Sequence, residues 1–404
     1  MFRAPLGRIV AFSSVVTGLL ACASSPRQVD LAPISISTAD SAAFVTRLGA
    51  DTMVIERFVI GGRRVEADVV LRVPTTSRTR YVVDLDTRGM ISSLDATAID
   101  SRTGTASPRQ RWVRAGDSLR ITTWRGGVDS SRTIAADAAV VPFIDMVHFP
   151  YEMMLTRAKN VTMTHGPRPM LSGGRVQQFV IGAHASSDST TITHPNRGTM
   201  TVATDSRGRI LTLDAGATTR KLVVKRLPFS AVDPAQVATA WSALDAAGRS
   251  FGVLSGRATP TYTVAGATIK LDHGTPVKRG REIWGALVKY GEVWRTGANT
   301  ATHITTDRNL VLDPSGAALA MPAGTYTLFS IPDDNGGWLI VSKETGQAGT
   351  AYDSSKDLGR VRLTARPLDA VVETFTIRAD PAGAGGELRL QWDKAERVVP
   401  FAVK

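Results

Sequence analysis

Four residues in and near one short motif could contact a ligand in the last third of the chain. In the motif WRTGAN, Trp294 and Arg295 precede a glycine-containing turn that ends at Asn299. The guanidinium of Arg295 and the amide of Asn299 could grip an anionic or hydroxyl-rich group, with Arg281 assisting. The same motif also suits a structural corner, because Gly297 and Asn299 favour turns and Trp294 can fill a core. The sequence therefore supports two interpretations, a ligand contact and a tight turn in a β-protein.

The histidines and acidic residues form no complete catalytic or metal-binding pattern. Asp145 and His148 are three residues apart in a segment with helical periodicity, which predicts an ordinary ion pair on one helical face. A hydrolase that uses His273 or His303 is the enzymatic alternative. Asp272 precedes His273 directly, however, and adjacent side chains in a strand point to opposite faces. The sequence also contains no G-x-S-x-G elbow, phosphate-binding glycine loop or zinc-ligand spacing. It therefore favours a non-enzymatic protein with no cofactor and no metal.

A second candidate site is apolar and lies in the N-terminal half of the chain. Residues 143–158 combine helical spacing with many Met and aromatic side chains, and Pro150 predicts a kink or a split into two short helices. Flexible Met side chains suit a pocket that accepts varied lipid tails, but they also suit a core beneath a sheet. The candidate pocket residues are Phe143, Met146, Phe149, Met153 and Met154.

The elements that must position both sites are mainly β-strands. Apolar alternation over residues 46–230 is interrupted by glycine-containing turns at 61–62, 88–89, 115–117 and 206–208. This pattern is typical of an antiparallel meander. We expect the first domain to be a half-barrel closed by a helical lid near 143–158, similar in general shape to periplasmic lipoprotein carriers.

One helix is predicted between the two β-regions. Asp233 suits its N-cap, Pro234 its first position and Gly248 its end. We therefore assign residues 231–256 to a linker helix and residues 257–404 to a second, β-sandwich-like domain.

The second domain resembles a known bacterial family. The pieces GREIWG, WRTGAN, AGTYTLFSIP and a final W-D…VP occur in this order. Over about residues 258–403 they resemble the domain of unknown function 2911 family, which implies an exported β-sandwich-like domain but no particular reaction. Two positions depart from the family pattern. Thr275 stands where relatives carry Arg, and Thr300 stands where they commonly carry Glu. Any chemistry that needs that Arg or Glu would be lost here.

The N-terminus has the features of a lipoprotein signal peptide. Residues 1–21 contain Arg3, Arg8 and an apolar run too short to span a bilayer, followed by LLAC, which resembles a lipobox. Cys22 is the only cysteine, so it has no intramolecular disulfide partner, and we expect it to carry a palmitate-type lipid anchor. Plain secretion after cleavage is the alternative. Residues 22–45 are small and polar and predict a flexible tether.

The charge distribution does not favour nucleic acid as a partner. The chain has 48 Lys and Arg against 36 Asp and Glu, but the basic residues are scattered rather than clustered. We expect an exported protein that is lipid-anchored to the cell envelope, with Ala23 favouring the outer membrane facing the periplasm. The leading hypothesis is a non-enzymatic protein that holds an apolar ligand in its N-terminal domain. The alternative is carbohydrate or cell-wall binding through the C-terminal domain.

Overall fold

The computed structural model describes residues 40–136, 139–160, 165–172, 174–183 and 188–404. The predicted signal peptide and Cys22 therefore lie outside the described residues. Strand β1 (Asp40–Leu48) begins within the predicted tether, and Phe44 is completely buried. The apolar run around Phe44 fills the core, so residues 40–45 belong to the folded sheet rather than to a tether.

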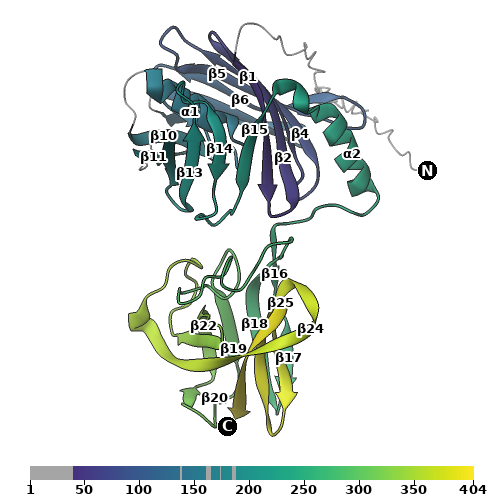
Figure 1. Ribbon diagram of the computed structural model, residues 1–404, viewed down its shortest axis with the longest axis vertical. Helices are drawn as coiled ribbons and strands as arrows, with labels where there is room; N and C mark the ends of the chain where they lie inside the picture. The colour runs from purple at the N-terminus through teal and green to yellow at the C-terminus, as the bar shows by residue number, and fades with distance from the viewer. Residues whose placement is uncertain (1–39, 137–138, 161–164, 173, 184–187) are drawn as a thin grey trace, which may run out of the picture.

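A sheet of 15 strands forms the N-terminal domain (Figure 1). Its strand order is β8-β7-β6-β5-β4-β3-β2-β1-β15-β14-β13-β12-β11-β10-β9, and all its described pairs are antiparallel except β9 with β10. The predicted hairpin turns lie between consecutive strands. The other strands are β2 (Asp51–Gly61), β3 (Arg64–Leu71), β4 (Ser77–Leu85), β5 (Ile91–Ile99), β6 (Ala106–Ala115), β7 (Ser118–Arg125), β8 (Val128–Ala135), β9 (Val141–Pro142), β10 (Gly166–Ser172), β11 (Arg175–Ala183), β12 (Ser189–His194), β13 (Gly198–Thr204), β14 (Ile210–Asp214) and β15 (Val223–Leu227).

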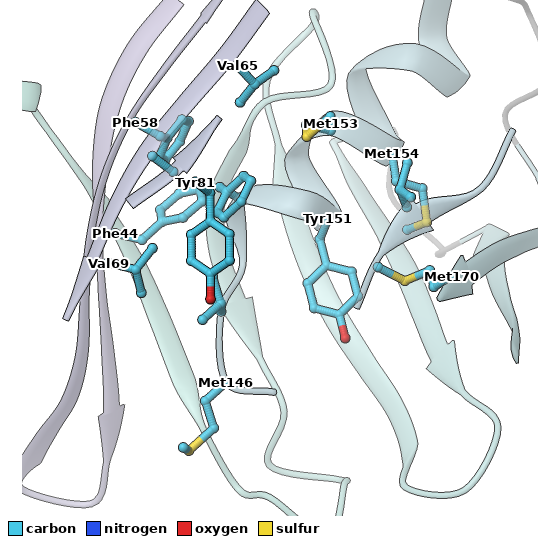
Figure 2. Packing of buried hydrophobic residues seen from close by; sticks show 14 of the residues in the cluster. Phe44, Phe58, Val65, Val69, Tyr81, Met146, Tyr151, Met153, Met154 and Met170 are labelled. Atoms are coloured by element: carbon cyan, nitrogen blue, oxygen red, sulfur yellow. The ribbon is translucent and has the colours of Figure 1, made fainter. Parts of the chain in front are cut away.

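Helix α1 (Phe149–Asn160) packs against the apolar face of this sheet. Tyr151, Met153 and Met154 of the helix belong to the same buried cluster as Phe44 and Phe58, and Figure 2 labels all five. The helix begins later than predicted, and the residues before it form β9 and a turn. Proline is tolerated in the first helical turn because the missing N–H has no partner there, so Pro150 lies where the helix starts instead of interrupting it.

Helix α2 (Pro234–Ala246) confirms the second helix prediction. The Asp233 side chain caps it by accepting a hydrogen bond from the Ala235 backbone N–H at 2.9 Å. The helix packs on the first domain, because Asp245 accepts the Thr76 N–H at 2.6 Å and the Arg72 guanidinium lies over the Trp241 ring. The helix is therefore part of the N-terminal domain, and the chain crosses to the second domain after it. A short 3-10 helix, η1 (Phe229–Ala231), precedes it.

The C-terminal domain is a second, separate sheet of ten strands. Eight pairings link nine strands in the order β16-β18-β19-β22-β23-β24-β25-β20-β21, and β17 pairs with β18. Phe375 and Trp392 are almost completely buried at its centre, in a sandwich-like arrangement. The mainly β fold class is confirmed. The elements are β16 (Ser255–Ala258), β17 (Thr261–Val264), β18 (Ala267–Pro276), β19 (Thr302–Thr306), β20 (Leu310–Leu312), β21 (Leu319–Met321), β22 (Gly324–Ile331), β23 (Gly336–Ser342), η2 (Ser354–Lys356), β24 (Asp357–Ala382) and β25 (Gly385–Val403).

Arg279 connects the two domains. Its Nη1 atom lies 3.6 Å from Oδ2 of Asp51, at the start of β2, and its guanidinium lies 3.6 Å from the ring centre of Phe251 in the crossover segment. A side chain at Gly49 would also collide with the Arg279 carbonyl oxygen, at 2.4 Å. The turn between β1 and β2 of the N-terminal domain therefore lies in backbone contact with the loop that follows β18 in the C-terminal domain.

Candidate functional site: a cleft between the domains

A cleft of about 1150 Å³ is lined by residues of both domains. Figure 1 shows that loops at one end of the first sheet face loops of the second. Residues 194–197 and 217–221 form much of the N-terminal wall of the cleft. The C-terminal wall contains all four candidate ligand-binding residues, namely Arg281, Trp294, Arg295 and Asn299. The structure therefore brings the four residues singled out in the sequence into one cavity.

The WRTGAN motif is a corner fixed by backbone hydrogen bonds. Trp294 and Ser330 exchange two such bonds, at 2.7 and 2.9 Å. Thr296 is fully buried with a φ of 51°, which is unusual for a β-branched residue, and Asn299 has a φ of 65°. The Thr296 hydroxyl donates to Ser330 Oγ at 3.0 Å, and its carbonyl accepts from Thr302 Oγ1 at 2.8 Å. These bonds hold the strained corner in one conformation.

Two glycines allow other segments to approach this corner. A Cβ atom at Gly274 would lie 2.0 Å from the Ala298 carbonyl oxygen, and one at Gly349 would lie 2.6 Å from the Asn299 carbonyl oxygen. Neither position tolerates a side chain unless the backbone moves. The corner is thus packed between β18 and the loop that contains Gly349.

Trp294 belongs to an aromatic cluster behind the corner. Its ring stacks on Trp392 with centres 6.1 Å apart and planes 15° apart, and it meets Trp284 and Phe375 edge-on. Trp392 is buried, whereas Trp294 is half-buried and reaches the cleft. The motif is therefore a structural corner, and the ligand contact stays a prediction, for which Trp294 presents a rigid aromatic surface to the cavity.

Three cations at the cleft are held by backbone carbonyl groups. Arg295 Nη1 donates to the Asn299 carbonyl at 3.2 Å, Arg281 Nε to that of Lys278 at 2.9 Å, and Lys221 Nζ to that of Gly216 at 2.7 Å. Among the residues that the structure describes, none of the three lies within 4 Å of a carboxylate oxygen.

The surroundings of these cations disfavour their positive charge. Burial lowers the pKa of Arg295, and burial together with the charge of Arg279 lowers the pKa of Arg281. Burial lowers the pKa of Lys221 as well, and the charges of Lys289, Arg281 and Arg295 lower it further, while the charge of Glu292 opposes this lowering. An anion placed in the cleft would offset both effects.

Asp145 organises the other arginines of the N-terminal wall. It accepts a hydrogen bond from Arg197 Nη1 at 2.5 Å and pairs with Arg220 on its other oxygen. Burial alone would raise the pKa of Asp145, but the Arg197 hydrogen bond and the Arg220 charge lower it below its ordinary value. The predicted Asp145–His148 pair is wrong, because the chain is not helical between these residues. His148 Nδ1 instead lies 3.2 Å from Glu56 Oε1.

His194 is a buried residue of this wall. Its Nδ1 accepts the backbone N–H of Asn196 at 3.0 Å, so the ring hydrogen belongs on Nε2, which has no partner among the described residues. Burial, and then the charge of Arg197, lowers the pKa of His194 to about 4. The side chain is 6% exposed and packs against Phe143 and Phe179.

The predicted apolar pocket is filled by its own side chains. Met146, Phe149, Met153 and Met154 are buried in the core of the first domain, and Phe143 is partly buried against it. Cavities of only about 30 and 60 Å³ adjoin this region in the described part of the chain, and about 30 Å³ is the share of one water molecule in the liquid. In the described part of the chain these residues therefore form a core beneath the sheet, and a lipid-sized pocket here stays a prediction.

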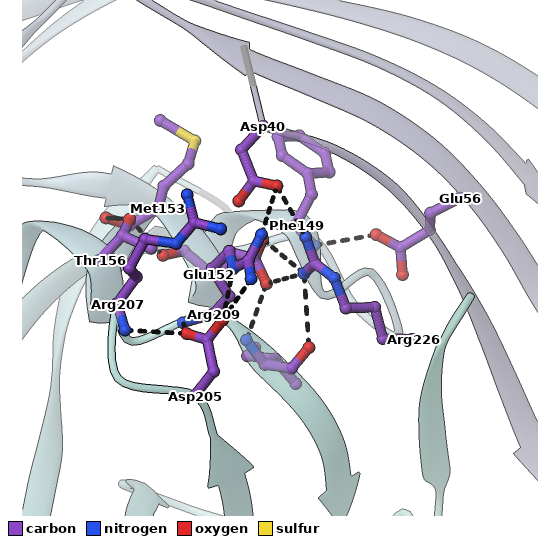
Figure 3. Close-up of polar contacts among 11 residues, drawn as sticks. Asp40, Glu56, Phe149, Glu152, Met153, Thr156, Asp205, Arg207, Arg209 and Arg226 are labelled. Carbon is purple, nitrogen blue, oxygen red and sulfur yellow. Dashed lines mark hydrogen bonds and ion pairs between the residues drawn. The ribbon is translucent and has the colours of Figure 1, made fainter. Parts of the chain in front are cut away.

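The structure reveals two buried carboxylates that the sequence analysis missed. Glu56 and Glu152 have no exposed surface. Figure 3 shows both among their polar contacts. Glu56 accepts the backbone N–H groups of His148 and Phe149, each at 2.9 Å, at the start of α1. Glu152 pairs with Arg226 at 2.7 Å and accepts the Ile210 N–H at 2.9 Å. An acid within the apolar run of β2 was the available signal for Glu56. Both carboxylates fasten the helix to the sheet.

The hydrolase alternative finds no support in the described residues. His273 Nδ1 donates to the Gly274 carbonyl at 3.2 Å, and His303 Nε2 accepts the Gly346 N–H at 3.1 Å. Neither imidazole forms a hydrogen bond with a carboxylate in the described part of the chain. The described residues also contain no group of three or more His, Cys, Asp or Glu side chains that could hold a metal ion. No described helix is both long and apolar enough to cross a membrane.

The fold and the cleft define a two-domain, mainly β protein with a ligand-sized cavity between its domains. Residues 255–401 match the family described as "protein of unknown function (DUF2911)", which confirms the resemblance seen in the motifs. The match includes the WRTGAN corner but not the wall segments 194–197 and 217–221. No curated protein matches the chain.

Proposed function

We propose that this chain is a lipid-anchored envelope protein that binds a hydroxyl-rich ligand, a carbohydrate or cell-wall fragment, in the cleft between its domains. The observation that carries the proposal is the gathering of Arg281, Trp294, Arg295 and Asn299 on one wall of that cleft. An aromatic ring packs against the apolar face of a sugar, while guanidinium and amide N–H groups donate to its hydroxyl groups.

The size of the cleft favours an oligomeric ligand. Its volume of about 1150 Å³ lies above the range of roughly 300–1000 Å³ typical of small-molecule pockets. The cavities near the apolar core hold only about 30 and 60 Å³. The cleft is therefore the better candidate, and the carbohydrate hypothesis replaces the lipid-tail hypothesis.

Binding is tested with the mature chain carrying Cys22→Ser, first on a glycan array and then by isothermal titration calorimetry with the best oligosaccharide. We expect Trp294→Ala to weaken binding at least tenfold, because the ligand loses its aromatic contact. Trp338→Ala is the matched control, since Trp338 is 37% exposed and is not part of the cleft wall. Equal affinity of wild type and Trp294→Ala would contradict the proposal. Trp294→Phe guards against a folding defect because it retains a ring at this position.

Membrane anchoring is tested separately. Cys22 is the only cysteine and follows a lipobox-like sequence, and each buried acyl CH₂ contributes about 0.8 kcal/mol to membrane binding. In a bacterial host we expect the wild type to fractionate with membranes and its N-terminal peptide to carry acyl chains by mass spectrometry. Cys22→Ser should abolish both. An unmodified Cys22 in the mature wild-type protein would refute the anchor.

A further inference from the structure

The cations of the cleft differ from the arginines that lie on the strands. Arg78 pairs with Asp68 at 2.6 Å, and Arg366 pairs with Glu387 at 2.8 Å. By contrast, Lys221, Arg281 and Arg295 form no ion pair with a carboxylate of the described residues, although all three line one cavity. Uncompensated and partly buried charges are unfavourable for folding, so this arrangement needs another explanation.

Among the described residues, Glu292 is the only carboxylate residue that lines the cleft, and it offsets these charges only in part. Its side chain is 65% exposed and lies 3.4 Å from Lys289, which is also exposed. Asp145, behind the N-terminal wall, is already shared between Arg197 and Arg220. The cleft therefore retains a net positive charge contributed by both domains.

The backbone fixes the cations before any ligand arrives. Lys221 has a φ of 57°, and Arg295 lies between the Trp294 bridge and the left-handed Thr296. Strained residues thus occur on both walls, as is common at binding sites where geometry is set in advance. Each cation also donates to a nearby carbonyl oxygen, which restricts its side chain and lowers the entropy lost on binding.

We propose that the cleft selects oligosaccharides that carry an anionic group, a carboxylate or a phosphate, and binds this group between Lys221 of the N-terminal domain and Arg281 and Arg295 of the C-terminal domain. The inference rests on the proposed carbohydrate function and adds its charge requirement. Guanidinium groups bind both carboxylate and phosphate in a bidentate manner. Trp294 and Arg295 both line the cleft, so one ligand would meet the aromatic ring with its sugar and the guanidinium with its charged group.

The experiment compares matched charged and neutral probes by titration calorimetry. One pair is an oligogalacturonate and its fully methyl-esterified form. The other is a phosphorylated mannose oligosaccharide and its dephosphorylated form. We expect at least one charged probe to bind tenfold or more tightly than its neutral partner, with affinity falling as salt rises from 50 to 200 mM. The pair that shows the difference identifies the anionic group.

Variants locate the charge recognition in the cleft. We expect Lys221→Met to reduce the preference for the charged probe at least fivefold, and Lys221→Arg to retain it. Arg366→Met is the control, because Arg366 lies on β24 and is not part of the cleft wall. An unchanged preference in a folded Lys221→Met protein would overturn the inference.

The outcomes separate this inference from the function on which it rests. Equal binding of charged and neutral probes that still depends on Trp294 would overturn the charge requirement and leave carbohydrate binding intact. Inorganic phosphate that binds as tightly as the phosphorylated oligosaccharide would overturn the requirement for a sugar. Failure of the wild type to bind any oligosaccharide would overturn both proposals.

Discussion

Replacement of Glu56 by Ala tests how helix α1 is held against the sheet. Glu56 lies on β2 with no exposed surface and accepts hydrogen bonds from the backbone N–H groups of His148 and Phe149, each at 2.9 Å. Its Oε1 also lies 3.2 Å from His148 Nδ1, which Thr46 Oγ1 approaches to 3.1 Å (Figure 3 shows Glu56 beside Phe149). In Glu56→Ala, two buried backbone donors lose their acceptor, and the packing of α1 leaves little room for water.

The expected loss follows from these two donors. Each buried donor left without a partner costs about 1–3 kcal/mol, so Glu56→Ala should lower the free energy of unfolding by about 2–6 kcal/mol. This is a large part of a typical net stability of about 5–15 kcal/mol. Glu56→Gln keeps a carbonyl acceptor and should lose only about half as much.

Urea unfolding of the whole chain, followed by far-UV circular dichroism, measures this difference through the midpoint of the transition at constant slope. The control is Asp129→Ala on the exposed edge strand β8, where a change within about 0.5 kcal/mol is expected. A Glu56→Ala protein within about 1 kcal/mol of the wild type would refute the reasoning. The N–H groups of His148 and Phe149 would then find other acceptors without the Glu56 carboxylate.

Three further predictions concern the cleft and its walls. Gly274→Ala should displace the WRTGAN corner and weaken oligosaccharide binding at least tenfold, because its methyl group would meet the Ala298 carbonyl at 2.0 Å; unchanged calorimetry would contradict this. His194 has a pKa of about 4 in the folded chain and about 6.5 when unfolded, so only the unfolded state gains a proton between these values. Stability should fall as pH drops through this window, and His194→Gln should flatten that dependence in thermal scans. Arg279→Ala removes the contact with Asp51 and should increase the radius of gyration in small-angle scattering; an unchanged radius would show that other contacts set the domain spacing.

Short sequence patterns predicted the strands, turns and helix α2 better than they predicted the cleft between the domains. Glycine turns and the Asp233-Pro234 cap are determined by residues within a few positions, so the hairpins and α2 follow from the sequence. The start of α1 could not be predicted from the sequence, because the apolar spacing over residues 142–148 fits a buried strand and turn as well as a helix. Met146 has a φ of 65°, which ends any helical path from Asp145 to His148. The predicted ion pair failed for this reason.

The N-terminal wall of the cleft could not be predicted, because it depends on pairing between distant segments. Strand β1 pairs with β15, with Thr46 opposite Val224. The first and the last strand of the N-terminal domain are therefore neighbours in its sheet. Lys221 lies in the turn that leads into β15, and its distance from Arg281 depends on that pairing and on the Arg279 contacts between the domains.

The two walls therefore contribute different parts of the proposed recognition. The aromatic corner lies within the DUF2911 match, and its conformation is set by contacts inside the C-terminal domain, with Ser330 and Thr302. Lys221 lies outside the match and acts on Arg281 and Arg295 only because the domains face each other. In the proposed recognition the second domain thus supplies the aromatic ring and two of the cations, and the first domain adds the third cation, Lys221. The relative position of the domains, held in part by Arg279, then becomes a determinant of ligand choice rather than a passive feature of the fold.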